Sequence, residues 1–202
     1  TVYLYVYTPS IRDVVTGTQS NFEASGGFGP NQVSTILGLG TIILFSRLFM
    51  YKSRLLNIID ISLLGLIAYR AIVTFSRGGV VTALVCIAIF FLVYVYYSNS
   101  QMRSKSFPKA FIIAGVVLMV WVWTSLATGG LIDKRYANED ASGRAKADLT
   151  TGRAELFNSE LEAFYKFPLT GIGVGKIKEY RLEQTGRESA SHNEVSRILS
   201  EH

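Results

Sequence analysis

The sequence is poor in cysteine, histidine and charged residues. Its one cysteine, Cys86, lies in an apolar run, which excludes an internal disulfide, and no Cys/His spacing indicates a zinc site. Charged residues make up only 17% of the 202 residues, whereas hydrophobic residues make up 49%. A chain of this composition is not an ordinary soluble domain of its size.

The formal net charge of +5 does not indicate a nucleic-acid-binding protein. Basic residues fall in short clusters beside apolar runs and in the terminal segment after residue 127. Of the 15 acidic residues, 12 also lie in that segment. This placement favours membrane anchoring and anion binding, with no nucleic-acid partner.

Four apolar runs are long enough to cross a bilayer, whose hydrocarbon core of about 30 Å needs roughly 20 helical residues. They predict an all-α, polytopic membrane helix bundle over residues 31–127. We expect residues 1–30 to be an extracytoplasmic segment or the tail of an earlier helix, and residues 128–202 to be a large helical loop. The chain is expected to be part of a longer protein, with helices missing at both ends. The four runs are Gln32 to Phe49, Leu55 to Ser76, Gly78 to Tyr97 and Ala110 to Ala127.

Basic residues between the runs predict the orientation. By the positive-inside rule, the clusters between the first two runs and between the last two runs lie in the cytoplasm. Residues 1–30, the turn at residues 76–79 and the loop after residue 127 then lie on the outer side. The clusters are Arg47, Lys52 and Arg54, and Arg103, Lys105 and Lys109.

Apolar spacing predicts two helices in the terminal loop. Apolar residues recur at helical intervals over residues 154–167, and Pro168 must end this helix. Ser191 and Glu194 stand three apart, as in a capping box, so a second helix is expected to start at His192.

Two arginines near the outer face are suited to a diphosphate. Arg70 and Arg77 are seven residues apart, which predicts one helix face and a separation of about 10 Å along the axis, with Thr74 between them. Guanidinium groups keep their charge and bind phosphate bidentately. The alternative is that Arg77 extends to the interface from a helix end, and that Arg70 pairs with another helix.

The loop contributes two further candidates. A helix dipole at its positive end keeps His192 neutral, so the imidazole could accept a proton; an exposed histidine in a capping turn is the alternative. Arg153 begins the first loop helix, where a cation opposes the dipole, so a functional reason for it gains weight. Asp60, near the cytoplasmic end of the second run, is expected to have a structural role as the partner of another side chain. Four other loop arginines, Arg135, Arg144, Arg181 and Arg187, are expected to be solvated.

Several strings, in this order, resemble the bacterial O-antigen ligase and polymerase family, over roughly residues 26–202. The segment from Gly27 to Asn31 is similar to the family's upstream segment. The other strings are Ser76-Arg77-Gly78-Gly79, Thr151-Gly152-Arg153, Phe167 to Gly175, Ser191-His192-Asn193-Glu194 and Leu199-Ser200-Glu201-His202.

The resemblance implies a multi-pass glycosyltransferase of the bacterial inner membrane, with its large loop on the periplasmic side. Such enzymes take a glycan from an undecaprenyl diphosphate carrier without a metal or another cofactor. Arg77, Arg153 and His192 match the family's functional residues: the arginines would bind and stabilise the diphosphate, and His192 would act as the base in an inverting transfer. Asn193 is expected to bind substrate beside them. Arg70 is added from helix spacing alone.

The acceptor stays open. Ligases of this family use the lipid A core, polymerases use another lipid-linked repeat, and related members glycosylate proteins. A transporter or flippase of polysaccharide lipids is the alternative from another class, because Arg70 and Asp60 lie inside an apolar run. Alternating access would require internal repeats, and the four runs show none.

Overall fold

A computed structural model describes residues 2–50, 53–146, 152–186, 191 and 193–202. Over these residues the protein is all-α, as the sequence predicts, and four helices have the length and composition to span a membrane. The chain divides into two compact units, residues 1–145 and residues 146–202. Unit 1 therefore includes residues 128–145, which the sequence pattern groups with the loop.

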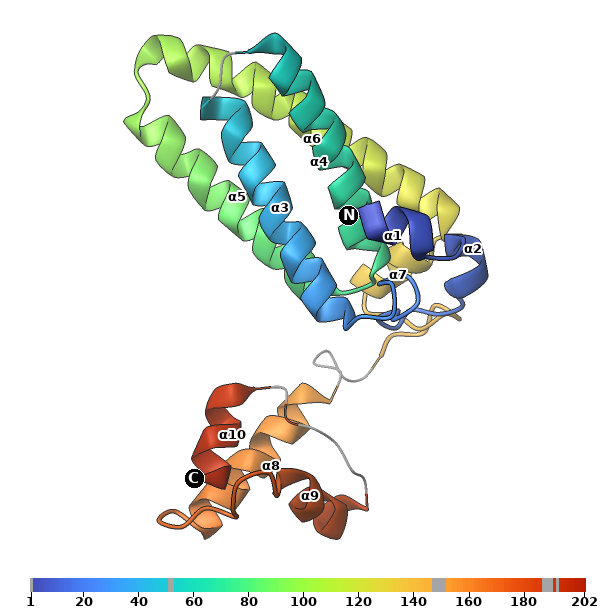
Figure 1. Cartoon of the computed structure of the whole chain (residues 1–202), viewed down its shortest axis with the longest axis vertical. Helices are drawn as coiled ribbons and strands as arrows, with labels where there is room; N and C mark the ends of the chain where they lie inside the picture. The colour runs from blue at the N-terminus through green and yellow to red at the C-terminus, as the bar shows by residue number, and fades with distance from the viewer. Residues whose placement is uncertain (1, 51–52, 147–151, 187–190, 192) are drawn as a thin grey trace. The chain divides into compact units, whose positions relative to one another are not determined.

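The four long helices of unit 1 form the membrane bundle (Figure 1). α3 packs against both α4 and α5, and α4 packs against α6. Most apolar side chains of α5 and α6 remain exposed within the chain, which suits contact with lipid, since helices satisfy their own backbone polar groups. The bounds are α3 (Pro30–Met50), α4 (Arg54–Val73), α5 (Arg77–Tyr97) and α6 (Ser100–Ala127).

α6 begins earlier than its apolar run. The Asn99 side chain caps this helix by accepting a hydrogen bond from the Met102 N–H at 3.0 Å. The expected basic connection is therefore the first turns of α6, and Pro108 lies inside the helix. Lys109 donates to the Leu48 carbonyl at 3.0 Å, which ties this end of α6 to α3.

The core at this end of the bundle is aromatic and contains one ion pair. Phe49 packs against Phe90 and Tyr94 with ring centroids 6.4 and 5.3 Å apart. Asp60 of α4 is buried and lies 3.2 Å from the Arg47 Nε of α3. Asp60 thus has the structural partner that the sequence predicts.

Three short helices gather at the opposite end, where α4 passes into α5 (Figure 1). They are α1 (Val2–Tyr7), α2 (Ile11–Val14) and α7 (Leu131–Tyr136). Ile132 of α7 is fully buried in a cluster with Ile72 and Phe75, which fastens α7 to the end of α4. The burial of Ile132 explains why residues 128–145 belong to unit 1.

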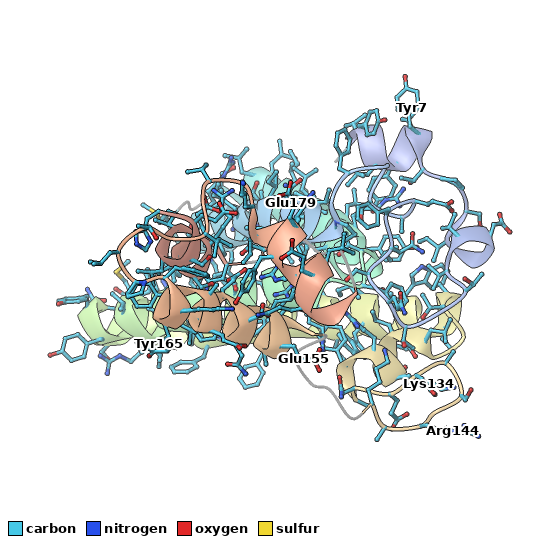
Figure 2. The ribbon with its side chains drawn as sticks, turned by 90° about the horizontal axis from the view of Figure 1, so that it is seen from below. Tyr7, Lys134, Arg144, Glu155, Tyr165 and Glu179 are labelled. Atoms are coloured by element: carbon cyan, nitrogen blue, oxygen red, sulfur yellow. The ribbon has the colours of Figure 1, made fainter. Side chains whose placement is uncertain are left out.

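Unit 2 contains α8 (Arg153–Lys166), α9 (Ile177–Thr185) and α10 (Glu194–Glu201). α8 and α10 lie in the two stretches where the sequence predicts helices, whereas apolar spacing does not indicate α9. In Figure 2, Tyr165 of α8 and Glu179 of α9 point outward from this unit, so its interior is formed by other faces of these helices.

Candidate functional site

The connection between α4 and α5 is a tight, buried turn. Phe75 has a left-handed φ of 56°, rare for a residue with a side chain, and its N–H bonds to the Ile72 carbonyl at 3.0 Å. The Thr74 hydroxyl accepts from the Ser76 N–H at 3.2 Å. This turn ends α4 at Val73, so Arg70 and Arg77 stand on two different helices. The prediction that they share one helix face is wrong, because it assumed a continuous helix.

Segments distant in sequence hold this turn in place. The Asn21 N–H donates to the Thr74 carbonyl at 3.1 Å, and the Ser76 hydroxyl donates to the Asn31 side-chain oxygen at 2.7 Å. Arg135 of α7 donates from its Nε to the Phe75 carbonyl at 3.0 Å. Arg77 is the first residue of α5 and follows this turn directly. These bonds therefore fix the position of its backbone.

The glycine at position 79 explains part of the Ser76-Arg77-Gly78-Gly79 string. A Cβ at Gly79 would lie 2.3 Å from the Ser34 Oγ and 2.5 Å from the Ser34 carbonyl carbon, so only glycine lets α5 pack this closely on α3. Gly78 faces open space. The string thus combines a close helix contact at Gly79 with a half-buried arginine at the start of α5.

Arg77 lies in a cationic environment. Its Nη1 donates to the Asn138 side-chain oxygen at 3.3 Å. Burial raises the pKa of Tyr136 to about 12, and the positive charges of Arg135 and Arg77 oppose this rise. Arg135, expected to be solvated, is buried because its guanidinium bonds to the Phe75 carbonyl and to the Ser20 hydroxyl. The guanidinium groups of Arg135 and Arg77 therefore lie close enough to Tyr136 for their positive charges to affect its pKa.

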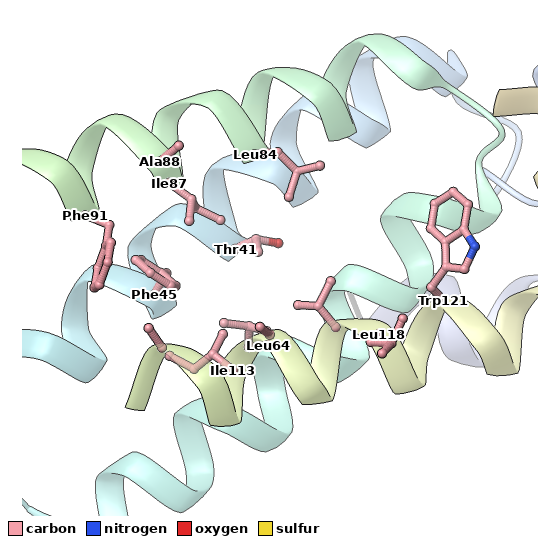
Figure 3. Close-up of a pocket in the computed structure, with 13 residues that line it drawn as sticks. Thr41, Phe45, Leu64, Leu84, Ile87, Ala88, Phe91, Ile113, Leu118 and Trp121 are labelled. Atoms are coloured by element: carbon pink, nitrogen blue, oxygen red, sulfur yellow. The ribbon is translucent and has the colours of Figure 1, made fainter. Parts of the chain in front are cut away.

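An apolar cavity of about 490 Å³ lies between the long helices of unit 1. It is lined by side chains of all four long helices, among them Thr41, Leu84 and Leu118, and Trp121 stands at one end of it (Figure 3). The Trp121 ring packs on Tyr136 with centroids 4.8 Å apart, and its indole N–H donates to an Asp133 carboxylate oxygen at 2.9 Å. Tyr136 thus links Trp121, at one end of the cavity, to the nearby charges of Arg135 and Arg77.

Arg70 has other partners. It is 5% exposed, its Nη2 donates to the Leu4 carbonyl, and its guanidinium lies 4.4 Å from the centre of the Tyr5 ring. It lines a separate cavity to which Arg77 does not contribute. The structure therefore does not bring Arg70 together with Arg77.

The candidates of unit 2 lie at helix starts. Arg153 is the first residue of α8 and is exposed. Asn193 is the N-cap of α10, because its side-chain oxygen accepts from the Val195 N–H at 3.1 Å. The predicted cap at Ser191 is wrong; the Ser191 hydroxyl accepts instead from the Asn193 N–H at 3.3 Å. His192 and Arg187 lie outside the described residues.

A buried carboxylate links the three helices of unit 2. Glu160 of α8 is 1% exposed and accepts hydrogen bonds from Arg181 of α9 and from the Ser196 hydroxyl of α10. The Arg181 Nε also donates to the Ser159 hydroxyl at 3.1 Å. Arg181, expected to be solvated, is therefore buried and paired. Glu160 fixes the helix that starts with Arg153 relative to the helix that Asn193 caps.

In chemical terms, the described residues offer charge stabilisation by arginine beside an apolar cavity. A group of three or more His, Cys, Asp or Glu side chains placed to hold a metal ion does not occur among them. Fixed guanidinium groups stabilise negative charge as it develops on a phosphate ester, and an apolar cavity accepts a hydrocarbon chain.

Comparison with known proteins gives one match. The family model described as O-antigen ligase matches residues 62–202, which include α5, α6 and the whole of unit 2. No curated protein and no solved structure matches the chain.

Proposed function

The chain belongs to the O-antigen ligase family, and on this premise we propose that it is a membrane glycosyltransferase that moves a glycan from an undecaprenyl diphosphate carrier to an acceptor. Its four helices, which are long and apolar enough to cross a membrane, support the membrane part of this proposal. The observation that carries the proposal is the position of Arg77. Its positive charge lies near Tyr136, and the Tyr136 ring packs on Trp121 at the end of an apolar cavity. An apolar cavity with positive charge near one end suits a lipid that carries a charged headgroup on a hydrocarbon chain.

The donor lipid fits this end of the bundle in two parts. Its hydrocarbon chain enters the apolar cavity, and its diphosphate lies at Arg77. As the bond between the sugar and the diphosphate breaks, negative charge grows on the departing oxygen. A guanidinium already fixed there stabilises the transition state more than the ground state. The bonds that hold the α4–α5 turn give Arg77 this fixed position.

Unit 2 supplies the remaining groups of the proposed reaction. Arg153 binds the diphosphate together with Arg77, and Asn193 binds substrate beside His192. His192 takes the proton from the acceptor hydroxyl while that oxygen attacks the anomeric carbon from the side opposite the diphosphate. One bond forms as the other breaks, undecaprenyl diphosphate leaves with the bonding electrons, and the anomeric configuration inverts. The arginines carry the stabilising charge, so this scheme uses no metal.

The proposed location is the bacterial inner membrane, with unit 2 on the periplasmic side. The positive-inside rule supports this orientation, because the cluster of Arg103, Lys105 and Lys109 lies at the end of α6 away from Trp121. Membrane anchoring also holds donor and acceptor in one plane, which raises their effective concentration. A lipid A core is the proposed acceptor; a second lipid-linked repeat or a protein hydroxyl is the alternative within the family.

A transfer assay tests the proposal. The full-length protein is purified and given a defined undecaprenyl-diphosphate glycan with each of the three acceptors in turn, with and without a chelator. Removing one positioned hydrogen-bond donor lowers catalytic rates by about 10²- to 10³-fold, and general base catalysis contributes about 10²- to 10⁴-fold. We therefore expect at least a 100-fold loss, on the order of these factors, for Arg77→Ala and for His192→Ala. Arg77→Lys keeps the charge without the bidentate geometry and should recover only part of the rate.

Matched controls separate these roles from general effects of charge. Arg144→Ala removes an exposed arginine of unit 1 (Figure 2), and Lys166→Ala removes the cation at the other end of α8; both should keep wild-type transfer. Wild-type turnover by His192→Ala would remove the base from the mechanism. Wild-type turnover by Arg77→Ala would remove the proposed diphosphate site.

A further inference from the structure

The cavity around Arg70 is a second, separate feature of unit 1. It measures about 370 Å³ and is lined by both polar and apolar groups, including the hydroxyl-bearing Thr8 and Ser10. Arg70 is buried at its wall, and its Nε and Nη1 have no hydrogen-bond partner among the described residues. Arg70 lines this cavity, and leaving two buried N–H groups unpaired is costly, so an anion that reaches the guanidinium from the cavity would be stabilised there.

An apolar groove continues from this cavity along the bundle. It measures about 500 Å³ and lies between α4 and α6, from Ile61 to Tyr69 on α4 and from Val116 to Trp123 on α6. The rings of Tyr5, Tyr69 and Trp123 line both the cavity and the groove, so the two spaces adjoin. Eight helical residues rise about 12 Å, which accommodates much of one acyl chain.

We propose that the Arg70 cavity and this groove together bind one anionic phospholipid of the surrounding bilayer. The phosphate accepts from the Nε and Nη1 of Arg70, and an acyl chain lies in the groove between α4 and α6. The tyrosine and tryptophan rings at the junction match the interfacial depth at which such rings prefer to lie. Arg70 also holds the Leu4 carbonyl, so the lipid phosphate completes a network that begins with α1.

Charge and position distinguish this site from the proposed donor site. Among the side chains that the structure describes around the cavity, Arg70 is the only charged one, which suits the single negative charge of a phosphodiester. The proposed donor site uses two arginines for a diphosphate. The groove beside Arg70 also shares no lining residue with the cavity that ends at Trp121.

Lipid binding to the full-length protein tests the proposal. The delipidated protein in detergent is titrated with phosphatidylglycerol, phosphatidylcholine of the same acyl chains, and undecaprenyl diphosphate, and bound lipid is counted by native mass spectrometry. Ser10→Asp places a carboxylate in the cavity, where it competes for Arg70; we expect phosphatidylglycerol to bind about 10- to 100-fold more weakly. Ser10→Asn has nearly the same shape without the charge and should bind like the wild type.

A second pair of variants tests the groove without touching the charge. A Cβ at Gly65 meets Val116 and Val120 at 3.6 and 3.9 Å, an ordinary contact, so a side chain can begin at this position and Gly65→Leu places its further atoms in the groove. We expect it to weaken phosphatidylglycerol binding. Gly115→Leu makes the same change on α6 at a position that does not line this groove but a neighbouring apolar hollow, and it should bind like the wild type.

Three results would overturn the proposal. Equal binding of phosphatidylglycerol and phosphatidylcholine would remove the anion site, and so would unchanged binding by Ser10→Asp. If undecaprenyl diphosphate displaced phosphatidylglycerol one for one and Ser10→Asp weakened both equally, the site would belong to the donor lipid and not to a phospholipid.

Discussion

Replacing Glu160 with glutamine tests how unit 2 is held together. The carboxylate is 1% exposed and its partner Arg181 is 2% exposed, so the substitution leaves an uncompensated buried cation between α8 and α9. Removing one partner of a buried ion pair costs about 3–5 kcal/mol. Because 1.4 kcal/mol corresponds to a factor of ten, the equilibrium constant for opening of unit 2 should rise about 10²- to 10⁴-fold. The rise cannot exceed the value set by complete unfolding of the unit.

Hydrogen exchange of the full-length protein measures this change directly. Amides of α8, α9 and α10 should lose protection in Glu160→Gln, whereas amides of α3 and α4 should not change. Glu155→Gln makes the same chemical change at an exposed position in the first turn of α8 (Figure 2) and should leave protection unaltered.

A double substitution separates the lost charge from the lost pair. Glu160→Leu with Arg181→Leu removes both charges, and it should recover most of the protection, since an apolar pair in place of a buried ion pair is often neutral. Ser196 keeps its second hydrogen bond, to the Asn193 carbonyl, in this variant. Unchanged exchange in Glu160→Gln would refute the reasoning, because it would mean that this carboxylate does not join the helices.

Two further predictions concern unit 1. Gly79→Ala forces α5 away from Ser34 and should lower the free energy of unfolding by about 1–3 kcal/mol, whereas the neighbouring Gly78→Ala meets open space and should not; thermal unfolding in detergent compares them. Burial raises the pKa of Tyr136 to about 12, above its usual value near 10, so the phenol loses its proton more readily in the unfolded chain. The free energy of unfolding is therefore unaffected by this group below pH 10 and falls as the pH rises toward about 12. Tyr136→Phe should be as stable as the wild type at pH 8, because the hydroxyl has no partner among the described residues, and should remove roughly 2 kcal/mol of the loss between pH 10 and 12.

The sequence predicts the membrane helices well because each is a long apolar run with a simple requirement for length. It also predicts α8, whose apolar spacing and Pro168 leave little freedom. It does not indicate α7 and α9, which are short. The basic residues before Lys109 extend α6 because Asn99 caps the helix, and a hydropathy pattern does not register such a cap.

Candidate residues are harder to place, because their partners lie far away in the sequence. Arg135 bonds to a carbonyl 60 residues before it, and Arg181 pairs with a carboxylate 21 residues before it, so both are buried although they lie in a polar loop. Arg70 and Arg77 fit one helix face only if the helix continues through Phe75. The polar Thr74 and Ser76 are the signal that could have located the turn.

Joint action of Arg77 and Arg153 on one donor diphosphate is the step on which the proposed function most depends. The most direct measurement is cross-linking of the full-length protein in a Cys86→Ala background. Gly78→Cys, beside Arg77, is combined with Ala154→Cys, beside Arg153, and treated with a short bis-maleimide with and without the donor lipid. The control combines Gly78→Cys with Leu169→Cys, an exposed position beyond the other end of α8.

The proposed function predicts that the pair at positions 78 and 154 cross-links, that donor lipid increases the yield, and that the control pair does not respond. Equal yields for both pairs, or no cross-link at positions 78 and 154 in the presence of donor, would contradict a shared diphosphate site.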